Sequence, residues 1–229
     1  MFLKDLLFPK FCLGCGFLGA YICHNCQKKL SYREKDFCLY CKRSSLNGFT
    51  HPICKRRDGI DGILSIFHYN NFLKTIIKSI KYRLATDVWK ELCLVIKPES
   101  LEKLKLFKNL SWGKFYFEPI PLYPSKLRIR GFNQAKIIAQ FFNQFLSCPL
   151  TAHLTRKKDT LSQAQLKSNQ DRYRNMRGAF QAESRDAIKG KNFILVDDVL
   201  TTGSTLKEAA RALKSAGAKN VLALVLAQG

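Results

Sequence analysis

Cysteine pairs crowd the first quarter of the chain. Seven of the nine cysteines lie between residues 12 and 54, and six of them form pairs with two residues between the cysteines, as in CLGC, CHNC and CLYC. Two cysteines at this spacing can share one tight turn and present both thiolates to a tetrahedral ion, with bonds of about 2.1–2.3 Å. A stretch this short has little core of its own, so metal binding would supply much of its folding energy. The pattern predicts structural zinc, with no open coordination position for catalysis.

The pairs can be assigned to zinc ions in two ways. The sequential assignment gives two sites, one from Cys12, Cys15, Cys23 and Cys26 and one from Cys38, Cys41, His51 and Cys54. The alternative is a single site from Cys12, Cys15, Cys38 and Cys41. His51 is the doubtful ligand, because it precedes Pro52 and could equally be a surface histidine. The spacing alone leaves the number of ions open.

Two adjacent carboxylates stand out in a chain of formal net charge +22. Asp197 and Asp198 follow an apolar run and precede the sequence TTGST, which opens an amphipathic pattern. A strand that runs into a helix in this way places a loop at the carboxyl edge of a parallel sheet, where ligands bind in open α/β folds. The loop offers hydroxyl groups at Thr201, Thr202, Ser204 and Thr205. With the helix N-terminus and the close approach that Gly203 allows, these groups predict an anion site.

The aspartates need a different partner, because carboxylates repel phosphate. Beside a phosphate site they are suited to accept hydrogen bonds from two neighbouring hydroxyls, so the pair and the loop together fit a ribose 5-phosphate. We expect both carboxylates to lie at a strand end, outside the core.

The elements that must position this loop alternate along the chain. Apolar runs predict strands over 63–70, 115–123, 192–199 and 220–227, and apolar residues at helical spacing predict helices over 71–84, 133–146 and 204–217. Such alternation favours a parallel sheet with helices on its faces. The polar stretch 155–190 has weak periodicity and is expected to form, in part, a mobile loop or hood.

A change in composition near residue 57 marks a domain boundary. The run CKRRDGIDG carries charges and two glycines, as a linker would. We predict a cysteine-rich zinc-ribbon domain over 1–57 and an α/β domain over 58–229. Charges and a proline interrupt MFLKDLLFPKF, and no other apolar run has the length of a membrane span. The cytosol is therefore the expected compartment.

The stretch VDDVLTTGST (196–205) closely resembles the PRPP-binding motif of type I phosphoribosyltransferases. That resemblance implies that Asp197 and Asp198 bind the ribose 2- and 3-hydroxyls, that residues 201–205 hold the 5-phosphate, and that magnesium can accompany PRPP. The segment PIPLYPSKLRIRGFNQA (119–135) resembles the pyrophosphate loop of the same fold, a basic loop that joins a strand to a helix. Its candidate contacts are Lys126, Arg128 and Arg130, which could equally form a solvated loop face.

Over nearly its whole length the chain resembles the ComF family of competence proteins. The resemblance rests on the cysteine pairs and on IKYR (80–83), RGFNQA (130–135), LTRKKDTLSQAQL (154–166), RYRNMRGAF (172–180) and VDDVLTTGST. It implies a type I phosphoribosyltransferase-like parallel sheet with helices on both faces, preceded by a small zinc-ribbon domain. The chain departs from the family at HPIC (51–54), where a CxxC pair is usual.

The same resemblance implies a role in natural transformation, where incoming single-stranded DNA is handled on the cytosolic side of the inner membrane. It leaves open a competence helicase or an inner-membrane DNA channel as a partner, and a position at the membrane surface. It implies no known reaction.

The basic excess independently indicates a polyanionic partner, because it is concentrated in residues 1–57 and 123–190. In the first of these segments Tyr32, Phe37 and Tyr40 lie among cations that we take as candidate DNA contacts. These are Lys28, Lys29, Arg33, Lys35, Lys42 and Arg43. The aromatic rings could stack on unpaired bases, at about 1–3 kcal/mol per base, or could equally form the small core of the ribbon. No groove-reading module is recognisable, which argues against sequence-specific duplex binding.

Three functions follow as hypotheses. The first is a protein that binds PRPP and single-stranded DNA during DNA uptake. The second is an active phosphoribosyltransferase acting on a base, nucleotide or nucleic-acid acceptor, although the sequence offers no recognisable pocket for a particular base. The third is a PRPP-sensing regulator of duplex DNA.

Overall fold

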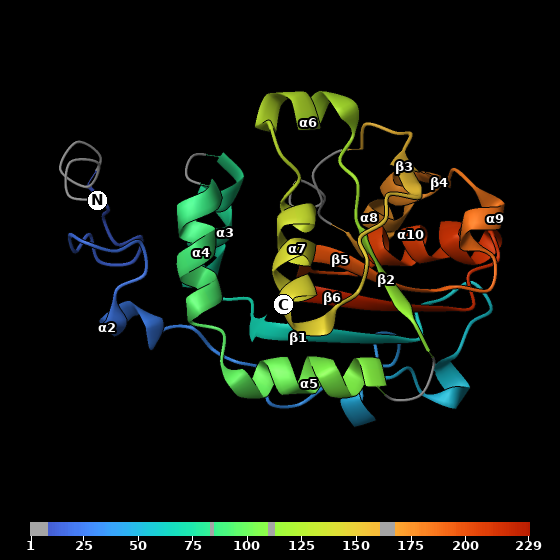
Figure 1. Ribbon diagram of the computed structural model, residues 1–229, viewed down its shortest axis with the longest axis horizontal. Helices are drawn as coiled ribbons and strands as arrows, with labels where there is room; N and C mark the ends of the chain where they lie inside the picture. Colours follow the sequence, from blue (N-terminus) through green and yellow to red (C-terminus); the bar gives the residue numbers. More distant parts are fainter. Residues whose placement is uncertain (1–8, 83–84, 110–112, 161–167) are drawn as a thin grey trace.

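A four-stranded parallel sheet lies at the centre of the computed structural model, which describes residues 9–82, 85–109, 113–160 and 168–229 (Figure 1). Its strand order is β1-β6-β5-β2. The strands are β1 (Gly62–His68), β2 (Phe115–Pro119), β5 (Asn192–Leu200) and β6 (Asn220–Gln228). All four predicted strands are confirmed, and β2 ends at Pro119, which has no N–H group for the ladder.

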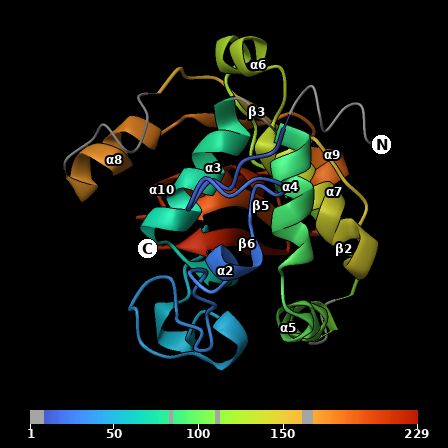
Figure 2. The same ribbon diagram turned by 90° about the vertical axis from the view of Figure 1, so that its left-hand side faces the viewer.

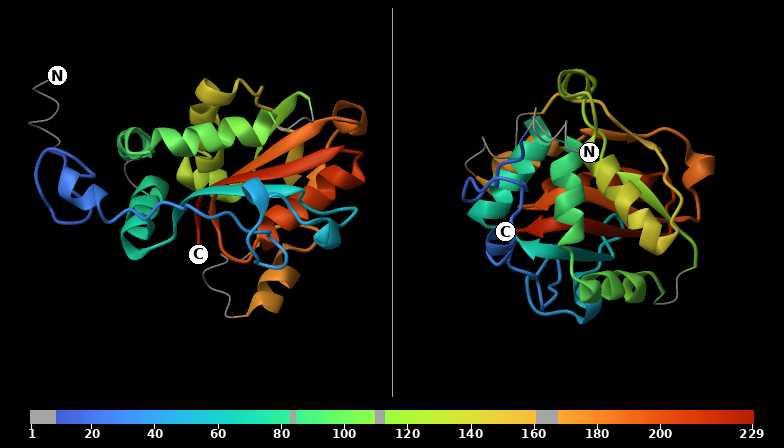
Figure 3. Two further views of the ribbon diagram at one scale, coloured as in Figure 1. Left: turned by 90° about the horizontal axis from the view of Figure 1, so that it is seen from below. Right: turned by 60° about the vertical axis from the view of Figure 1, so that its left-hand side comes forward.

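Helices cover both faces of this sheet, as the alternation predicts (Figure 3). One face carries α3 (Asn71–Tyr82), α4 (Ala85–Leu94), α5 (Pro98–Asn109) and α7 (Gln134–Leu146). The other face carries α10 (Ser204–Ser215) with α8 (Asn169–Met176) and α9 (Arg185–Ile188). The predicted α/β fold class is confirmed. None of the helices within the described ranges is long and apolar enough to cross a membrane.

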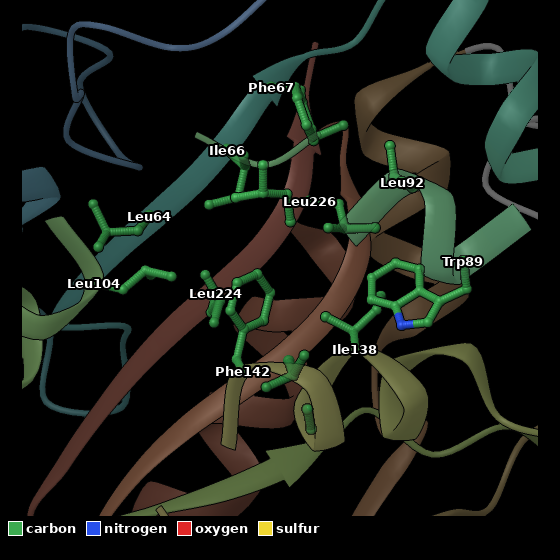
Figure 4. Close-up of a cluster of buried hydrophobic side chains, with 14 of the residues drawn as sticks. Leu64, Ile66, Phe67, Trp89, Leu92, Leu104, Ile138, Phe142, Leu224 and Leu226 are labelled. Carbon is green, nitrogen blue, oxygen red and sulfur yellow. The ribbon is translucent and has the colours of Figure 1, made fainter. Parts of the chain in front are cut away.

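The two central strands are buried on both faces, so each sends alternate side chains into a different core. On β5, Ile194 and Val196 join the cluster under α3, α4 and α7, whereas Phe193 and Leu195 join the cluster under α10. Figure 4 shows the first cluster, where Trp89 of α4 and Phe142 of α7 meet the leucines of β1 and β6. This two-sided burial explains why the strands read as nearly continuous apolar runs.

The polar stretch 155–190 contains more regular structure than its weak periodicity suggests. Here β3 (Leu154–Arg156) and β4 (Phe180–Ala182) form an antiparallel pair that lies against α10, with α8 between them in sequence. Residues 161–167, part of the predicted hood, lie outside the described residues. The pairing escaped prediction because each strand is only three residues long.

A short helix replaces the basic loop predicted after β2. This helix, α6 (Pro124–Arg130), begins with Pro124 in its first turn and ends at Gly131 in the left-handed conformation, with φ of 78°. Each of its seven residues is exposed or half-buried, and it stands out from the body at the top of Figure 1. The sequence lacks an apolar stripe at this point because α6 packs against no core.

The cysteine-rich segment packs directly on the α/β body. It contains α2 (His24–Gln27) and two 3-10 turns, η1 (Leu46–Gly48) and η2 (Pro52–Cys54). Tyr32 forms a β-bridge with Phe67 of β1, and Phe49 forms one with Gly62 at the start of that strand. Leu30 joins the first core and Leu39 the second. The domain boundary at residue 57 stays a prediction, but the segment shares its buried side chains with the body.

Glu118 of β2 is fully buried between the sheet and the chain that leads to β3. Burial raises the pKa of its carboxyl group, and the N–H of Leu154 donates to Oε1 at 2.8 Å. The Thr151 hydroxyl lies 2.7 Å from Oε2 and 3.0 Å from the carbonyl oxygen of Phe117. One hydroxyl proton cannot serve both acceptors at once. The N–H of Thr151 already donates to the Phe117 carbonyl oxygen at 2.8 Å, so the hydroxyl proton can go to Oε2 of Glu118.

Candidate functional site

The predicted anion loop lies where β5 passes into α10, between Leu200 and Ser204. β5 extends beyond the aspartate pair, so both carboxylates belong to the strand and not to its end. Asp197 is half-buried, and Asp198 is only 7% exposed. The expectation that both lie outside the core is therefore wrong for Asp198. The pairing of β5 with β6 continues to Leu200, and this pairing encloses the carboxylate.

Gly203 makes the turn that joins the strand to the helix. Its φ is 77°, and a β-carbon at this position would lie 3.2 Å from Leu200 Cδ1 and 3.2 Å from Leu39 Cδ1. On either side, the hydroxyls of Thr202 and Ser204 are 2.9 Å apart. The loop thus has the glycine, the hydroxyls and the helix N-terminus that an anion site needs. Of the predicted loop residues, Thr201 is exposed, Thr202 and Thr205 are half-buried, and Ser204 is buried.

Arg156 is a site residue that the sequence analysis missed. It is the last residue of β3. Its guanidinium donates to Thr160 and lies over the ring of Phe180, 5.6 Å from the ring centroid. Burial lowers the pKa of Arg156, while Asp197 and Asp159 oppose that shift by attraction. A half-buried cation therefore lies within electrostatic range of Asp197 of β5. The motif LTRKKDT was available as a signal, but nothing in its pattern showed that it folds back onto β5.

The candidate pyrophosphate contacts are engaged within the protein. Lys126 of α6 forms an ion pair of 2.9 Å with Asp159 and donates to the carbonyl oxygen of Thr160. Hydrogen bonding from Lys126 lowers the pKa of Asp159. Arg130 donates to the side-chain oxygen of Gln134 at the start of α7. Arg128 is exposed.

A small apolar pocket lies on the other side of Asp198. Its walls come from α3, α4, α7 and β6, and they include Trp89, Gln134 and Leu226. Gln134 is the residue to which Arg130 donates, so the α6–α7 corner and Asp198 border one pocket. No sequence pattern predicts this pocket, because its lining comes from elements far apart along the chain.

The cysteines form two groups, in the sequential arrangement. Cys12, Cys15, Cys23 and Cys26 make one group, and Cys38, Cys41, His51 and Cys54 the other, with all ligand atoms in a group within 4.8 Å of one another. Cys15 Sγ and Cys23 Sγ are 3.6 Å apart, close to the edge of about 3.8 Å that follows from tetrahedral zinc with 2.3 Å bonds. The single-site alternative does not form, because its two pairs lie in different groups. Both clusters suit structural zinc.

His51 has the surroundings of a metal ligand. Its Nδ1 lies 3.3 Å from Cys41 Sγ, and its Nε2 lies 3.0 Å from the carbonyl oxygen of Ser44. Histidines that bind metals usually donate their second N–H to such an acceptor, which fixes the tautomer. In each group one thiol is also predisposed to ionise. Burial opposes this, but backbone N–H groups outweigh it and lower the pKa of Cys12 and of Cys38 to about 6.

The candidate DNA contacts divide between the two cysteine groups. Lys28 and Lys29 follow α2, whereas Lys42 and Arg43 follow Cys41 in the second group. These four and Lys35 are exposed, and Arg33 is half-buried, 5.1 Å from the ring centroid of Phe37. Figure 1 shows α2 at the left-hand end, apart from the light-blue turns η1 and η2 below the sheet, and Figure 2 looks along the direction of that separation. The six cations therefore do not form one patch.

Two of the three aromatic residues serve the protein interior. Tyr32 packs on Phe67 with ring centroids 5.0 Å apart, and its hydroxyl donates to the carbonyl oxygen of Val95. The Tyr40 hydroxyl accepts from the N–H of Ile60 at 2.9 Å. These contacts favour the ribbon-core interpretation of Tyr32 and Tyr40 over base stacking.

Comparison of the sequence with known proteins finds relatives that agree with this combination of a phosphoribosyltransferase-type loop and cysteine groups. A family model described as "Phosphoribosyl transferase domain" matches residues 129–229, which include Arg156, both aspartates and the loop. The chain is 29% identical over 212 residues to "Competence protein F" of Haemophilus influenzae, with 87% of each chain covered. It is 28% identical over 207 residues to "Competence protein ComFC" of Bacillus subtilis, with 86% of this chain and 79% of the relative covered. Over most of its length the chain is similar to the ComF competence proteins.

A further relative shares less of the chain. "DNA utilization protein YhgH" of Escherichia coli is 37% identical over 103 residues, 44% of each chain. The matches to the two competence proteins span most of the chain, so the predicted ComF resemblance is confirmed.

Proposed function

We propose that this protein binds PRPP at the β5–α10 loop and single-stranded DNA on its basic surface, and that it acts in DNA uptake. The observation that carries the proposal is the β5–α10 junction. There a carboxylate pair precedes a hydroxyl-bearing turn at Gly203, at the N-terminus of a twelve-residue helix. The competence and DNA-utilization names of the relatives support the biological role.

In this proposal each part of the site takes one part of PRPP. Residues 201–205 hold the 5-phosphate, because backbone N–H groups and the helix N-terminus favour an anion there. Asp197 and Asp198 accept hydrogen bonds from the ribose hydroxyls. Lys126 and Arg130 would exchange their present partners for the diphosphate, and Arg156 adds positive charge beside Asp197. Magnesium, when bound, neutralises the diphosphate.

Isothermal titration with PRPP, with and without magnesium, tests the first half. We expect saturable binding by the wild-type protein and a large loss in Asp197→Asn. Asp197 suits this test better than its neighbour, because it is only half-buried and the fold depends less on it. Wild-type protein that fails to bind PRPP would overturn this half of the proposal.

Fluorescence anisotropy with a labelled single-stranded oligonucleotide tests the second half. We expect affinity to fall steeply as salt rises from low to physiological concentration, because neutralised phosphates release their counterions. An unlabelled duplex should compete poorly, since no groove-reading module is recognisable. An affinity for the oligonucleotide that does not change with salt concentration would contradict electrostatic binding. Tighter binding to the duplex would favour the third hypothesis, a PRPP-sensing regulator.

An active transferase is the second candidate, favoured by Arg156 beside Asp197 and by the pocket next to Asp198. In that reaction an acceptor nitrogen would form a bond to C1 of the ribose, the C1–oxygen bond to diphosphate would break, and the acceptor would lose its proton. Acceptor-dependent release of pyrophosphate, lost in Asp197→Asn, would establish it. PRPP binding without release under any acceptor would leave the binding function alone.

A further inference from the structure

The second cysteine group reaches the phosphate loop. Leu39 lies between Cys38 and Cys41, it is fully buried, and its Cδ1 would be 3.2 Å from a β-carbon on Gly203. Leu39 belongs to the same core cluster as Leu206 in the first turn of α10. The turn that carries two candidate zinc ligands is therefore packed against the loop that is the candidate 5-phosphate site.

Cations gather around Tyr40, the residue after Leu39. The Arg56 guanidinium lies 4.8 Å from the centroid of the Tyr40 ring, and Lys207 Nζ of α10 lies 5.5 Å from it. Lys207 Nζ is also 3.4 Å from the carbonyl oxygen of Thr202 in the loop. The ring of Tyr40 thus contacts two cations, Arg56 from the cysteine-rich segment and Lys207 from α10.

The cations repel one another, and the attraction that acts on Lys42 comes from the thiol of Cys38. Burial lowers the pKa of Lys207, and repulsion from Lys42 and Arg56 lowers it further. Within the described part of the chain, Lys42, Arg56 and Lys207 form no ion pair. Nearby Asp61 is committed to Lys214 at 2.8 Å, and the nearby Asp58 attracts Arg211. Three positive charges lie close together, and neither nearby carboxylate forms an ion pair with them, an arrangement that favours a bound anion.

We propose that Arg56 and Lys207, which both lie over the ring of Tyr40, form with the nearby Lys42 a second phosphate site that takes a backbone phosphate of single-stranded nucleic acid. This inference rests on the proposed function and specifies where its DNA lies. The site joins the cysteine-rich segment to α10, so a bound strand passes directly beside the 5-phosphate loop. The candidate contacts taken from sequence included Lys42 but neither Arg56 nor Lys207.

A phosphodiester fits this site better than a small free anion. Lys42 and Arg56 are exposed, and the cations come from side chains on an open surface, whereas a free phosphate is better held by the backbone N–H groups of the adjacent loop. A strand can also contact the further cations of the segment, such as Arg33, which lies close enough to affect Lys42. Strand binding needs several such contacts in a row.

The test compares two double variants that each lose one lysine and one arginine. Lys42→Ala/Arg56→Ala removes two cations of the cluster. Arg185→Ala/Lys219→Ala is the matched control, because both residues are exposed and lie at α9 and before β6, near the amino ends of β5 and β6. Anisotropy of a fluorescein-labelled dT20 oligonucleotide is measured over a series of salt concentrations. PRPP titration and zinc content are measured on the same preparations.

We expect the cluster variant to bind dT20 at least tenfold more weakly than the control. Its salt slope should be smaller by about 1.4, since each lost phosphate contact on a single strand is worth about 0.7. PRPP affinity should stay within twofold of wild type in both variants. Equal dT20 affinity and slope in the two variants would overturn this site and leave the proposed function standing.

Other outcomes separate the remaining explanations. Wild-type protein that fails to bind dT20 would remove the proposed DNA function itself. A cluster variant that loses PRPP affinity while dT20 binding is kept would make the cluster part of the PRPP site, against this inference. Displacement of dT20 by millimolar inorganic phosphate at constant ionic strength would make it a site for free anions.

Discussion

Replacing Gly203 by alanine tests the geometry of the phosphate loop most directly. The residue has φ of 77°, and left-handed backbone costs an L-residue about 1–2 kcal/mol. The added β-carbon would also lie 3.2 Å from the ends of Leu200 and Leu39. Crowding of this kind typically costs a further 1–3 kcal/mol. We therefore expect Gly203→Ala to lower the free energy of unfolding by about 2–5 kcal/mol.

Gly190→Ala is the matched control. Gly190 has nearly the same φ, 74°, but no heavy atom lies within 4 Å of a β-carbon placed there. It should lose only the backbone cost, so urea unfolding should show it to be more stable than Gly203→Ala by about 1–3 kcal/mol.

The two variants should differ in binding as well. We expect PRPP affinity to fall at least tenfold in Gly203→Ala and to be unchanged in Gly190→Ala, because only Gly203 lies in the loop. If both variants unfolded with the same free energy and bound PRPP as the wild type does, the packing of Leu39 on a functional loop would be wrong.

Three further predictions concern zinc, the aspartate pair and a buried acid. Wild-type protein should contain two zinc ions by elemental analysis. Cys15→Ser and Cys41→Ser should each lose one zinc ion. Only Cys41→Ser should weaken PRPP binding, since only the second cysteine group packs on the loop. Well under one zinc ion per wild-type chain would contradict both sites. Asp197→Asn should weaken PRPP binding by about 1.5–3 kcal/mol, the contribution of hydrogen bonds to a charged group, with a melting temperature near that of wild type; unchanged calorimetric affinity would refute the assigned role. Glu118→Gln should gain stability relative to wild type between pH 5 and pH 8 in urea unfolding, because the raised pKa of Glu118 gives stability that is complete below 4.5 and lost as pH rises through its folded value. A difference that stays constant or shrinks with pH would show that folding does not raise the pKa of Glu118.

The sequence predicted what depends on local pattern. The strands around β5 and β6 follow from their apolar runs, and the loop after Asp198 follows from a strand, a glycine and a helix start in succession. The cysteine groups follow from paired spacing, since two ligands on one turn need no knowledge of the fold.

What escaped prediction depends on contacts between distant segments. Arg156 comes within electrostatic range of Asp197 because β3 folds back beside α10, and three-residue strands leave almost no pattern. Asp198 is buried because β5 keeps pairing with β6 beyond the last apolar residue of the run, and that register is a property of the sheet. Tyr40 acquires Lys207 from a helix more than 160 residues away in sequence.

The strand order has a consequence for synthesis on the ribosome. β1 pairs in the sheet with β6, which emerges about 150 residues later, so at about 5–20 residues per second one edge of β1 waits on the order of 10–30 s for its partner. The other edge is covered from the start. The backbone N–H of Arg33 donates to the carbonyl oxygen of Ile66, and the backbone N–H of His68 donates to that of Ser31. The cysteine-rich segment therefore lies along this edge of β1. If metal binds this segment during synthesis, the folded segment would cover one edge of the nascent apolar strand and reduce its aggregation.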